Sequence, residues 1–191
     1  MQPYEKTKEW FTEYDRPWGI AGGWAIDLFI GRNTREHSDL EVAVLRSDQH
    51  YLKTVFADWS FRKVVKGEFH EWNEEHLELP VHEVHAIQHQ TGDPLEVLLN
   101  EVSAAKWVFR RDSTITFPAS SLFLKTKEGL PYLHPAIVLL YKAKGTRPKD
   151  TMDFQNAYPL LEEQDKQWLY AALQTHTPGH EWISRMEGEL K

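Results

Sequence analysis

The chain has 191 residues, enough for one domain, or for a compact domain with a helical appendage, and for a sizeable core. Its 22 Lys and Arg against 29 Asp and Glu give a net charge of −7, which argues against general nucleic-acid binding, because such binding depends on neutralising many phosphates. There is no cysteine, so disulfides, thiolate zinc sites and cysteine nucleophiles are excluded.

The first residues and the hydropathy pattern bear on location. Residues 1–6 lack the basic-then-apolar pattern of a signal peptide, and no apolar run approaches the ~20 residues of a membrane span. We therefore expect a soluble cytoplasmic protein that does not enter a membrane.

The N-terminal part of the chain predicts alternating helices and strands. Helical spacing of apolar residues and flanking glycines predict three helices, over 5–14, 24–30 and 48–58. Strands are predicted at 18–21 and at 38–46. The Gly22-Gly23 pair joins the first strand to the second helix, and Gly31 ends that helix.

The middle and C-terminal parts differ in character. Between residues 61 and 117 the β-formers predict five short strands, at 61–65, 76–79, 81–87, 95–99 and 107–109. Beyond residue 131 we expect an apolar helix over 136–144, opened by His134-Pro135, and two more helices over 150–162 and 164–175. The order predicts an α/β fold with a mixed sheet, divided near residue 128 into a core (1–128) and a C-terminal helical region (129–191) packed on that core.

Asp39 and Glu41 lie two residues apart in a strand-like segment. Residues i and i+2 of a strand point to the same face, so the two carboxylates project together while Leu40, Val42 and Val44 turn toward the core. Adjacent like charges repel each other unless a cation lies between them. The pair therefore predicts a site for a divalent metal ion, and the alternative is a solvated strand face.

Gly22 and Gly23 stand at a strand-to-helix turn, sixteen positions before Asp39. Glycine allows close approach of the backbone, and the free amides at the start of a helix favour anionic oxygens. The pair thus suits a polyphosphate, although a Gly-Gly turn also serves ordinary chain reversal.

The segment from Gly22 to Val42 resembles the nucleotidyltransferase superfamily with the DNA polymerase β-type catalytic core. It looks most like the small bacterial aminoglycoside and lincosamide nucleotidyltransferases, of the aminoglycoside 2″-adenylyltransferase type. Their signature is a Gly-Gly or Gly-Ser turn, a short helix and an acidic-x-acidic strand. Further positions match as well: Trp24, Asp27, Arg32, Thr34, Arg35 and His37. Glu41 departs from the pattern, since Asp is commoner there, but its longer side chain still ligates Mg²⁺.

The resemblance implies a third carboxylate on a neighbouring strand, which helps to hold metal and can accept the proton of the attacking hydroxyl. The candidates are Glu78, Glu83, Glu96 and Glu101. We choose Glu96, a single acid in an otherwise apolar strand, where a buried charge needs a metal or a partner. The runner-up is Glu83, and the structural alternative for Glu96 is a pair with Arg110.

Basic side chains for a triphosphate are expected from two places. Arg35 precedes the acidic strand and could reach phosphate, or could pair with Glu36 or Asp39. The segment 147–154 resembles the C-terminal helical region of the family, which makes Lys149 the first choice for a phosphate contact and Lys142 the second.

Histidines suggest a competing metal site, since His70, His76, His82, His85 and His89 fall within twenty residues. In a strand, His82 and His85 point to opposite faces, and His85 and His89 are about 13 Å apart, too far to share one ion. We therefore do not predict a histidine metal site there. His37 is expected either to orient the active-site loop or to form a structural hydrogen bond.

Taken together, the resemblance implies a Mg²⁺-dependent, adenylyltransferase-like enzyme with a nucleotidyltransferase-type core. Asp39, Glu41 and Glu96 would hold two Mg²⁺ ions about 3.5–4 Å apart. ATP is the expected co-substrate, and AMP would pass to a hydroxyl of a small acceptor. By analogy with the antibiotic-resistance enzymes, an aminoglycoside-like cation is the candidate acceptor, which the acidic chain would tolerate.

Two points stay open in the sequence. A homodimer is compatible with it. A catalytically silent nucleotide-binding or antitoxin-like interaction module of the same fold is the alternative function, and release of pyrophosphate separates that module from an enzyme.

Overall fold

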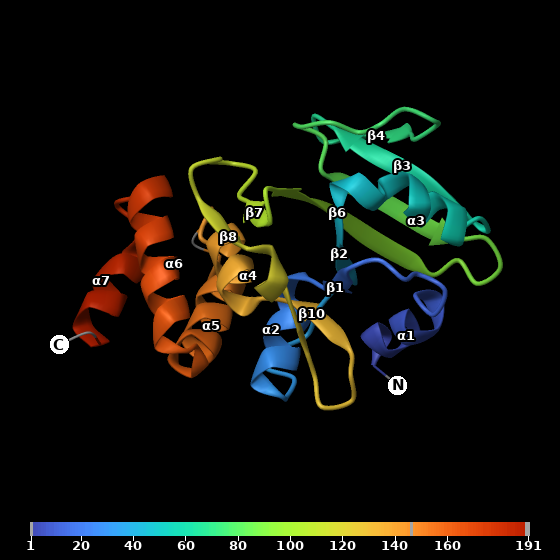
Figure 1. Ribbon diagram of the computed structural model, residues 1–191. Coiled ribbons are helices and arrows are strands. Elements are labelled where there is room, and N and C mark those ends of the chain that lie inside the picture. The colour runs from blue at the N-terminus through green and yellow to red at the C-terminus, as the bar shows by residue number, and fades with distance from the viewer. Residues whose placement is uncertain (1, 146, 190–191) are drawn as a thin grey trace.

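The computed structural model describes residues 2–145 and 147–189. Within them, ten strands form a mixed sheet, with helices on its faces and further helices in the C-terminal part of the chain (Figure 1). The strands are β1 (Trp18–Ile20), β2 (Glu41–Leu45), β3 (Trp59–Val65), β4 (Glu68–Glu71), β5 (Glu83–Gln88), β6 (Pro94–Ser103), β7 (Lys106–Val108), β8 (Thr116–Pro118), β9 (Phe123–Lys125) and β10 (Pro131–Leu133). The α-helices are α1 (Lys6–Trp10), α2 (Gly22–Ile30), α3 (Gln49–Val55), α4 (Pro135–Lys142), α5 (Pro148–Ala157), α6 (Glu163–His176) and α7 (Glu181–Glu189). Short 3₁₀ turns cover Pro3–Glu5, Arg46–Asp48, Ala119–Ser121 and Tyr158–Leu160.

Strand β2 lies near the middle of the sheet, whose order is β4-β3-β5-β6-β2-β1-β10-β9. It runs antiparallel to β1 and parallel to β6, and its residues Val42, Ala43 and Val44 are fully buried. Strand β7 extends from β6 and pairs with β8. A buried run of apolar residues on a strand covered on both faces explains this central place.

The helices begin and end where the sequence carries the expected signals. Helix α2 ends at Gly31, which adopts the left-handed conformation (φ 81°) that favours glycine. Helix α4 begins after His134, whose ring accepts a hydrogen bond from the Ala136 amide, with Pro135 in the first turn. Helices α5, α6 and α7 gather at the side of the molecule away from β3 and β4 (Figure 1).

The sequence-based elements differ from the structure at several places. The strand expected at 76–79 is wrong, because Leu77 bonds to side chains instead of a ladder: its amide donates to Gln49 Oε1 (2.7 Å) and its carbonyl accepts from Arg46 Nη1 (2.8 Å). The N-terminal helix covers only Lys6–Trp10. Asp39 lies in the loop before β2 rather than within the strand. Strands β4, β8, β9 and β10 and helix α7 were not expected.

The division expected near residue 128 falls in the turn between β9 and β10, where Gly129 has φ 81°. Strand β10, beyond this point, pairs in parallel with β1, and helix α4 packs against α2. The division into two regions stays a prediction. In the described part of the chain, no helix is both long and apolar enough to cross a membrane.

Candidate active site

A cleft of about 290 Å³ opens between the carboxyl-bearing strands and helix α4. Carboxylates, guanidinium groups and lysines line it together. All of the predicted site residues border this cleft: Gly22, Gly23, Arg35, Asp39, Glu41, Glu96, Lys142 and Lys149. The structure thus brings together residues from the first third, the middle and the C-terminal part of the chain.

Three carboxylates converge because of the register between two parallel strands. Glu41 of β2 is the direct partner of Glu96 of β6, and the Glu96 amide donates to the Leu40 carbonyl (2.9 Å). Asp39 precedes β2 and accepts a hydrogen bond from the Ser38 hydroxyl (2.6 Å). Glu41 and Glu96 are therefore direct neighbours, and Asp39 lines the same cleft.

The electrostatics of these acids favour the binding of a cation. Burial, followed by repulsion from Glu41, Glu83 and Asp39, raises the pKa of Glu96 to about 8. Burial also raises the pKa of Glu41, against an opposing effect of Lys142. No described residue forms a salt bridge with Glu96, so the alternative pair with Arg110 is not formed. Half-buried carboxylates without a counter-charge are well placed to receive a metal ion.

Gly22 and Gly23 pass close to the site. Gly22 has φ +59°, and a Cβ atom there would overlap the carboxylate of Glu41. A Cβ atom at Gly23 would overlap the side chains of His37 and Arg35. Only glycine therefore lets the start of α2 approach the acids and the loop.

Asp27 of α2, to which the sequence analysis gave no role beyond the resemblance, holds the loop that leads to Asp39. Its Oδ1 accepts from the Thr34 amide (3.1 Å) and hydroxyl (2.5 Å). Its Oδ2 lies 2.6 Å from Nε2 of His37, and both side chains are buried. His37 therefore acts in a structural hydrogen bond that also fixes the active-site loop.

Arg35 and Lys142 meet at Asp153, a fully buried residue of α5. Arg35 donates to Asp153 from Nε (2.9 Å) and Nη2 (2.8 Å), and Lys142 Nζ lies 2.7 Å from the same carboxylate. The predicted alternatives for Arg35, pairs with the carboxylates of Glu36 or Asp39, are not formed; its Nη1 donates to the Glu36 backbone carbonyl (2.9 Å). Asp153 lies within the segment 147–154 but was not predicted as a site residue.

The cleft is also lined by two arginines that the sequence analysis did not place there, Arg110 and Arg111. Arg110 and Arg111 lie over the ring of Tyr141, with guanidinium carbons 5.5 and 5.2 Å from its centroid. Neither forms a salt bridge with a described residue, and burial lowers the pKa of both. In the sequence, the pair of adjacent arginines directly after a predicted strand was the feature that could have indicated their place in the site.

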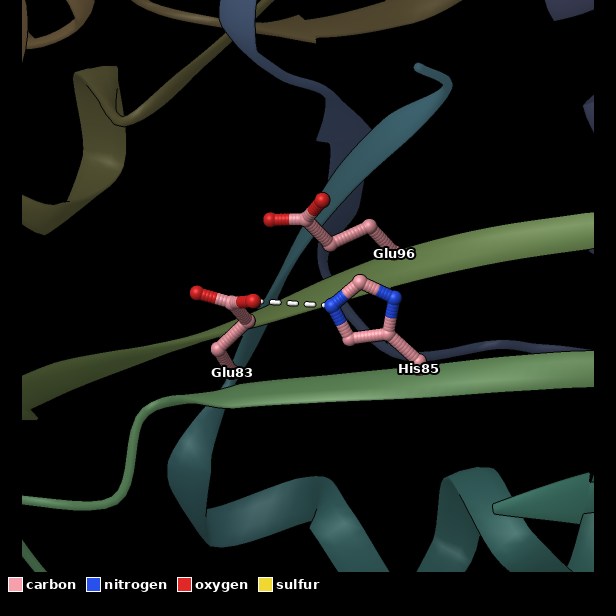
Figure 2. A group of neighbouring side chains, drawn as sticks. All are labelled: Glu83, His85 and Glu96. Carbon is pink, nitrogen blue, oxygen red and sulfur yellow. Dashed lines mark hydrogen bonds and ion pairs between the residues drawn. The ribbon is translucent and has the colours of Figure 1, made fainter. Parts of the chain in front are cut away.

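Glu83, the runner-up for the third carboxylate, also borders the cleft. Figure 2 shows it with His85 and Glu96: the glutamate and the imidazole come from one strand and are joined by a hydrogen bond of 2.8 Å, while Glu96 comes from the next strand. Of the five histidines of this segment, His82 borders the cleft, and His85 reaches Glu96 from the neighbouring hollow.

Comparisons with known proteins identify one matching family and several solved structures with a similar fold. A family model described as aminoglycoside-2″-adenylyltransferase matches residues 5–112, more than half of the chain. This stretch includes the glycine turn and the three acids. No curated protein matches the chain.

Solved structures share the fold. ANT(2″)-Ia in complex with adenylyl-2″-tobramycin is 16% identical with a TM-score of 0.59, covering 91% of this chain and 96% of its own. The solution structure of ANT(2″)-Ia is 16% identical with a TM-score of 0.57, covering 93% and 96%. The lincosamide antibiotic adenylyltransferase LnuA, bound to lincomycin, is 14% identical with a TM-score of 0.58, covering 83% and 96%. These likenesses extend over almost the whole of each relative.

Proposed function

The chain belongs to the aminoglycoside-2″-adenylyltransferase family of nucleotidyltransferases, and we propose that it transfers AMP from ATP to a hydroxyl of a small acceptor. The observation that carries this proposal is the convergence of Asp39, Glu41 and Glu96 beside the Gly22-Gly23 turn in one cleft. Nucleotidyl transfer requires positioned acids next to a phosphate-binding turn, and the cleft supplies both.

The acids fit Mg²⁺ by their chemistry. Asp39, Glu41 and Glu96 offer only oxygen ligands, which Mg²⁺ prefers, and within the described residues no lysine or arginine forms an ion pair with Glu96. We propose that these three residues hold two Mg²⁺ ions. When bound, Mg²⁺ would neutralise charge on the triphosphate and lower the pKa of the acceptor hydroxyl.

Triphosphate binding is assigned to the glycine turn and the basic side chains. The amides at the start of α2 suit anionic oxygens. Lys149 forms no ion pair with a described residue, whereas Lys142 and Arg35 already neutralise Asp153. Lys149 is therefore the first phosphate contact in this proposal, and Arg35 and Lys142 supply longer-range positive charge.

In the proposed reaction the acceptor oxygen forms a bond to the α-phosphorus while the bond to the pyrophosphate oxygen breaks. The proton of the acceptor hydroxyl passes to the carboxylate of Glu96. In the metal-free protein burial and neighbouring acids raise the pKa of Glu96, and bound Mg²⁺ would lower it again, so that the carboxylate would be ionised and able to accept this proton. Pyrophosphate leaves with both electrons of the broken bond.

The acceptor class is the finer part of the proposal. The family description supports an aminoglycoside-like acceptor, and Glu83 would attract a cationic amine. Arg110 and Arg111, which line the same cleft, would repel one. The acceptors to be tested therefore include aminoglycosides, lincosamides, neutral sugars and anionic sugar acids.

The test measures pyrophosphate release with ATP, Mg²⁺ and this panel, for wild type and for Asp39→Asn. Removal of a metal ligand should lower turnover at least about 100-fold, since metal binding supplies several kcal/mol of transition-state stabilisation. Glu71→Gln, on the exposed strand β4, is the matched control and should retain activity. Nucleotide binding without turnover of any acceptor would instead support the silent module.

A further inference from the structure

Glu83, His85 and Glu96 form a second possible ligand set beside the three acids (Figure 2). One ligand atom from each lies within 4.8 Å of the other two, and all three residues are half-buried. In the part of the chain that the structure describes, this is the group of acids and histidines with metal-ligand spacing. It includes an imidazole, unlike the set of Asp39, Glu41 and Glu96.

The strand geometry explains why these side chains meet. Glu83 and His85 are two residues apart on β5, so they share one face. His85 is the direct antiparallel partner of Glu96 on β6. The arrangement therefore follows from strand register and does not depend on a flexible loop.

The imidazole of His85 is already oriented. Its Nε2 lies 2.8 Å from Glu83 Oε1, and its ring packs edge-on against Phe69 of β4, with centroids 4.8 Å apart. Phe69 is 52% exposed, and this contact gives a reason for its place on the surface. A ligand held in position before binding loses less freedom when the ion arrives.

Solvent reaches the group from two sides. Glu83 borders the cleft, and His85 borders a neighbouring hollow of about 400 Å³ that Trp10 and Trp24 also line. Glu96 borders both. An ion can therefore enter without disturbing the core.

We propose that Glu83, His85 and Glu96 bind a first-row transition-metal ion, Zn²⁺ by preference, with water completing the coordination. Imidazole nitrogen and carboxylate oxygen are both ligand types that Zn²⁺ accepts, whereas Mg²⁺ prefers oxygen ligands alone. The site is distinct in its ligands from the Asp39 and Glu41 pair but shares Glu96 with it.

Because Glu96 belongs to both ligand sets, Zn²⁺ binding should affect catalysis, an expectation that rests on the proposed function. When Glu96 ligates Zn²⁺ together with His85, it is withdrawn from Asp39 and Glu41. Zn²⁺ should therefore inhibit nucleotidyl transfer, and the inhibition should weaken when His85 is removed.

The experiment begins with binding alone. Metal-free full-length protein is titrated with Zn²⁺ by calorimetry, and with Co²⁺ while its visible absorption is recorded. We expect one Zn²⁺ per chain and a Co²⁺ spectrum with a nitrogen ligand. His85→Ala should weaken Zn²⁺ binding by more than about 10-fold. Asp39→Asn and the exposed-histidine control His89→Ala should leave that binding unchanged.

Three results would overturn the site: no Zn²⁺ binding, binding that survives His85→Ala, or binding lost in Asp39→Asn. Glu83→Gln provides a second ligand variant if His85→Ala fails to fold, as judged by circular dichroism. Inhibition of pyrophosphate release by Zn²⁺ is then compared between wild type and His85→Ala. Because calorimetry needs no turnover, failure of the proposed enzymatic function leaves the metal-site test intact.

Discussion

Gly22 is the residue on which the position of Glu41 depends most directly. Its φ of +59° lies in the left-handed region, and a Cβ atom at this point would overlap the Glu41 carboxylate. The backbone strain alone costs about 1 kcal/mol or more for a non-glycine residue. The displacement of a proposed metal ligand adds a functional cost.

We expect Gly22→Ala to lower pyrophosphate release by about 100-fold or more, because Glu41 must move away from Asp39 and Glu96. The variant should also lose about 1–2 kcal/mol of unfolding free energy. Steady-state kinetics and urea unfolding measure the two effects.

Gly31→Ala is the matched control. Gly31 has φ +81°, also in the left-handed region, but a Cβ atom there would meet nothing within 4 Å. This variant should lose about 1 kcal/mol of stability and keep its activity. Equal activity losses in the two variants would show that strain, rather than the contact with Glu41, is responsible.

For single residues, the sequence predicted which side chains line the site better than it predicted their hydrogen-bond and ion-pair partners. Spacing placed Asp39 beside Glu41, and an acid in an apolar strand pointed to Glu96; the structure brings all three together. Their roles in metal binding stay predictions. The partner of Arg35 could not be inferred, because Asp153 is 118 positions away and nothing local links the two residues.

Helices α4 and α5 and the loop before β2 are joined by one carboxylate. Asp153 is fully buried and receives Arg35 from the loop and Lys142 from α4, and these hydrogen bonds and charges lower its pKa despite its burial. Removing one partner of a buried pair leaves the other charges uncompensated. The elements around the cleft are thus held together electrostatically.

Asp153→Asn should destabilise the protein by about 3–5 kcal/mol, the usual cost of breaking a buried ion pair. It should also weaken nucleotide affinity, because Arg35 and the loop lose their fixed position. Urea unfolding and calorimetry with a non-hydrolysable ATP analogue measure these effects.

Glu181→Gln provides the surface comparison, since Glu181 pairs with Arg185 one turn away on α7 with both side chains exposed. Its loss should cost less than about 0.5 kcal/mol. A similarly small loss for Asp153→Asn would mean that the cleft elements are held by packing alone.

Elements with strong local signals were predictable and short ones were not. Gly31 and the His134-Pro135 pair marked the limits of α2 and α4 correctly. Strands β8, β9 and β10 have three residues each, too few for a visible alternation. Residues 76–79, wrongly predicted as a strand, have a strand-like composition. Their backbone at Leu77 forms hydrogen bonds with the side chains of Gln49 and Arg46 instead of with a neighbouring strand.

For the whole molecule, the clustered acids make stability depend on pH when metal is absent. Burial and neighbouring acids raise the pKa of Glu96 from 4.5 to about 8. Between these values the folded protein holds a proton that the unfolded chain has released. This contribution to stability is therefore present at low pH and is lost as the pH rises toward about 8.

We expect Glu96→Gln to raise the melting temperature of metal-free protein, and to raise it more near pH 8.5 than near pH 5.5. A gain of one kcal/mol corresponds to about 2–4 °C for a chain of this size. Adding Mg²⁺ at the higher pH should stabilise wild type more than the variant, because wild type binds it better.

Melting curves with EDTA or Mg²⁺ at the two pH values provide the measurement, with Glu71→Gln on the exposed strand β4 as the control. The control should follow wild type at both pH values. A pH dependence identical in wild type and Glu96→Gln would contradict the assignment of the effect to this carboxyl group.

The fold class was predictable because the pattern changes along the chain. The expected mixed α/β sheet with C-terminal helices is confirmed. The order of strands was not predictable, since the pairing of β1 with β10 depends on contacts between distant segments. Composition and periodicity carry no information on such pairing.

The place of β10 beside β1 also has a consequence for synthesis of the chain. The edge of β1 at Ile20 stays uncovered until the ribosome has synthesised its partner Tyr132. At about 5–20 residues per second, this takes of the order of ten seconds. During this time a nascent chain exposes an open strand edge, the usual starting point for aggregation. A protein truncated by a nonsense mutation near residue 128 would keep this edge of β1 exposed permanently. It would also lack Lys142, Lys149 and Asp153, so we do not expect it to be a smaller working enzyme.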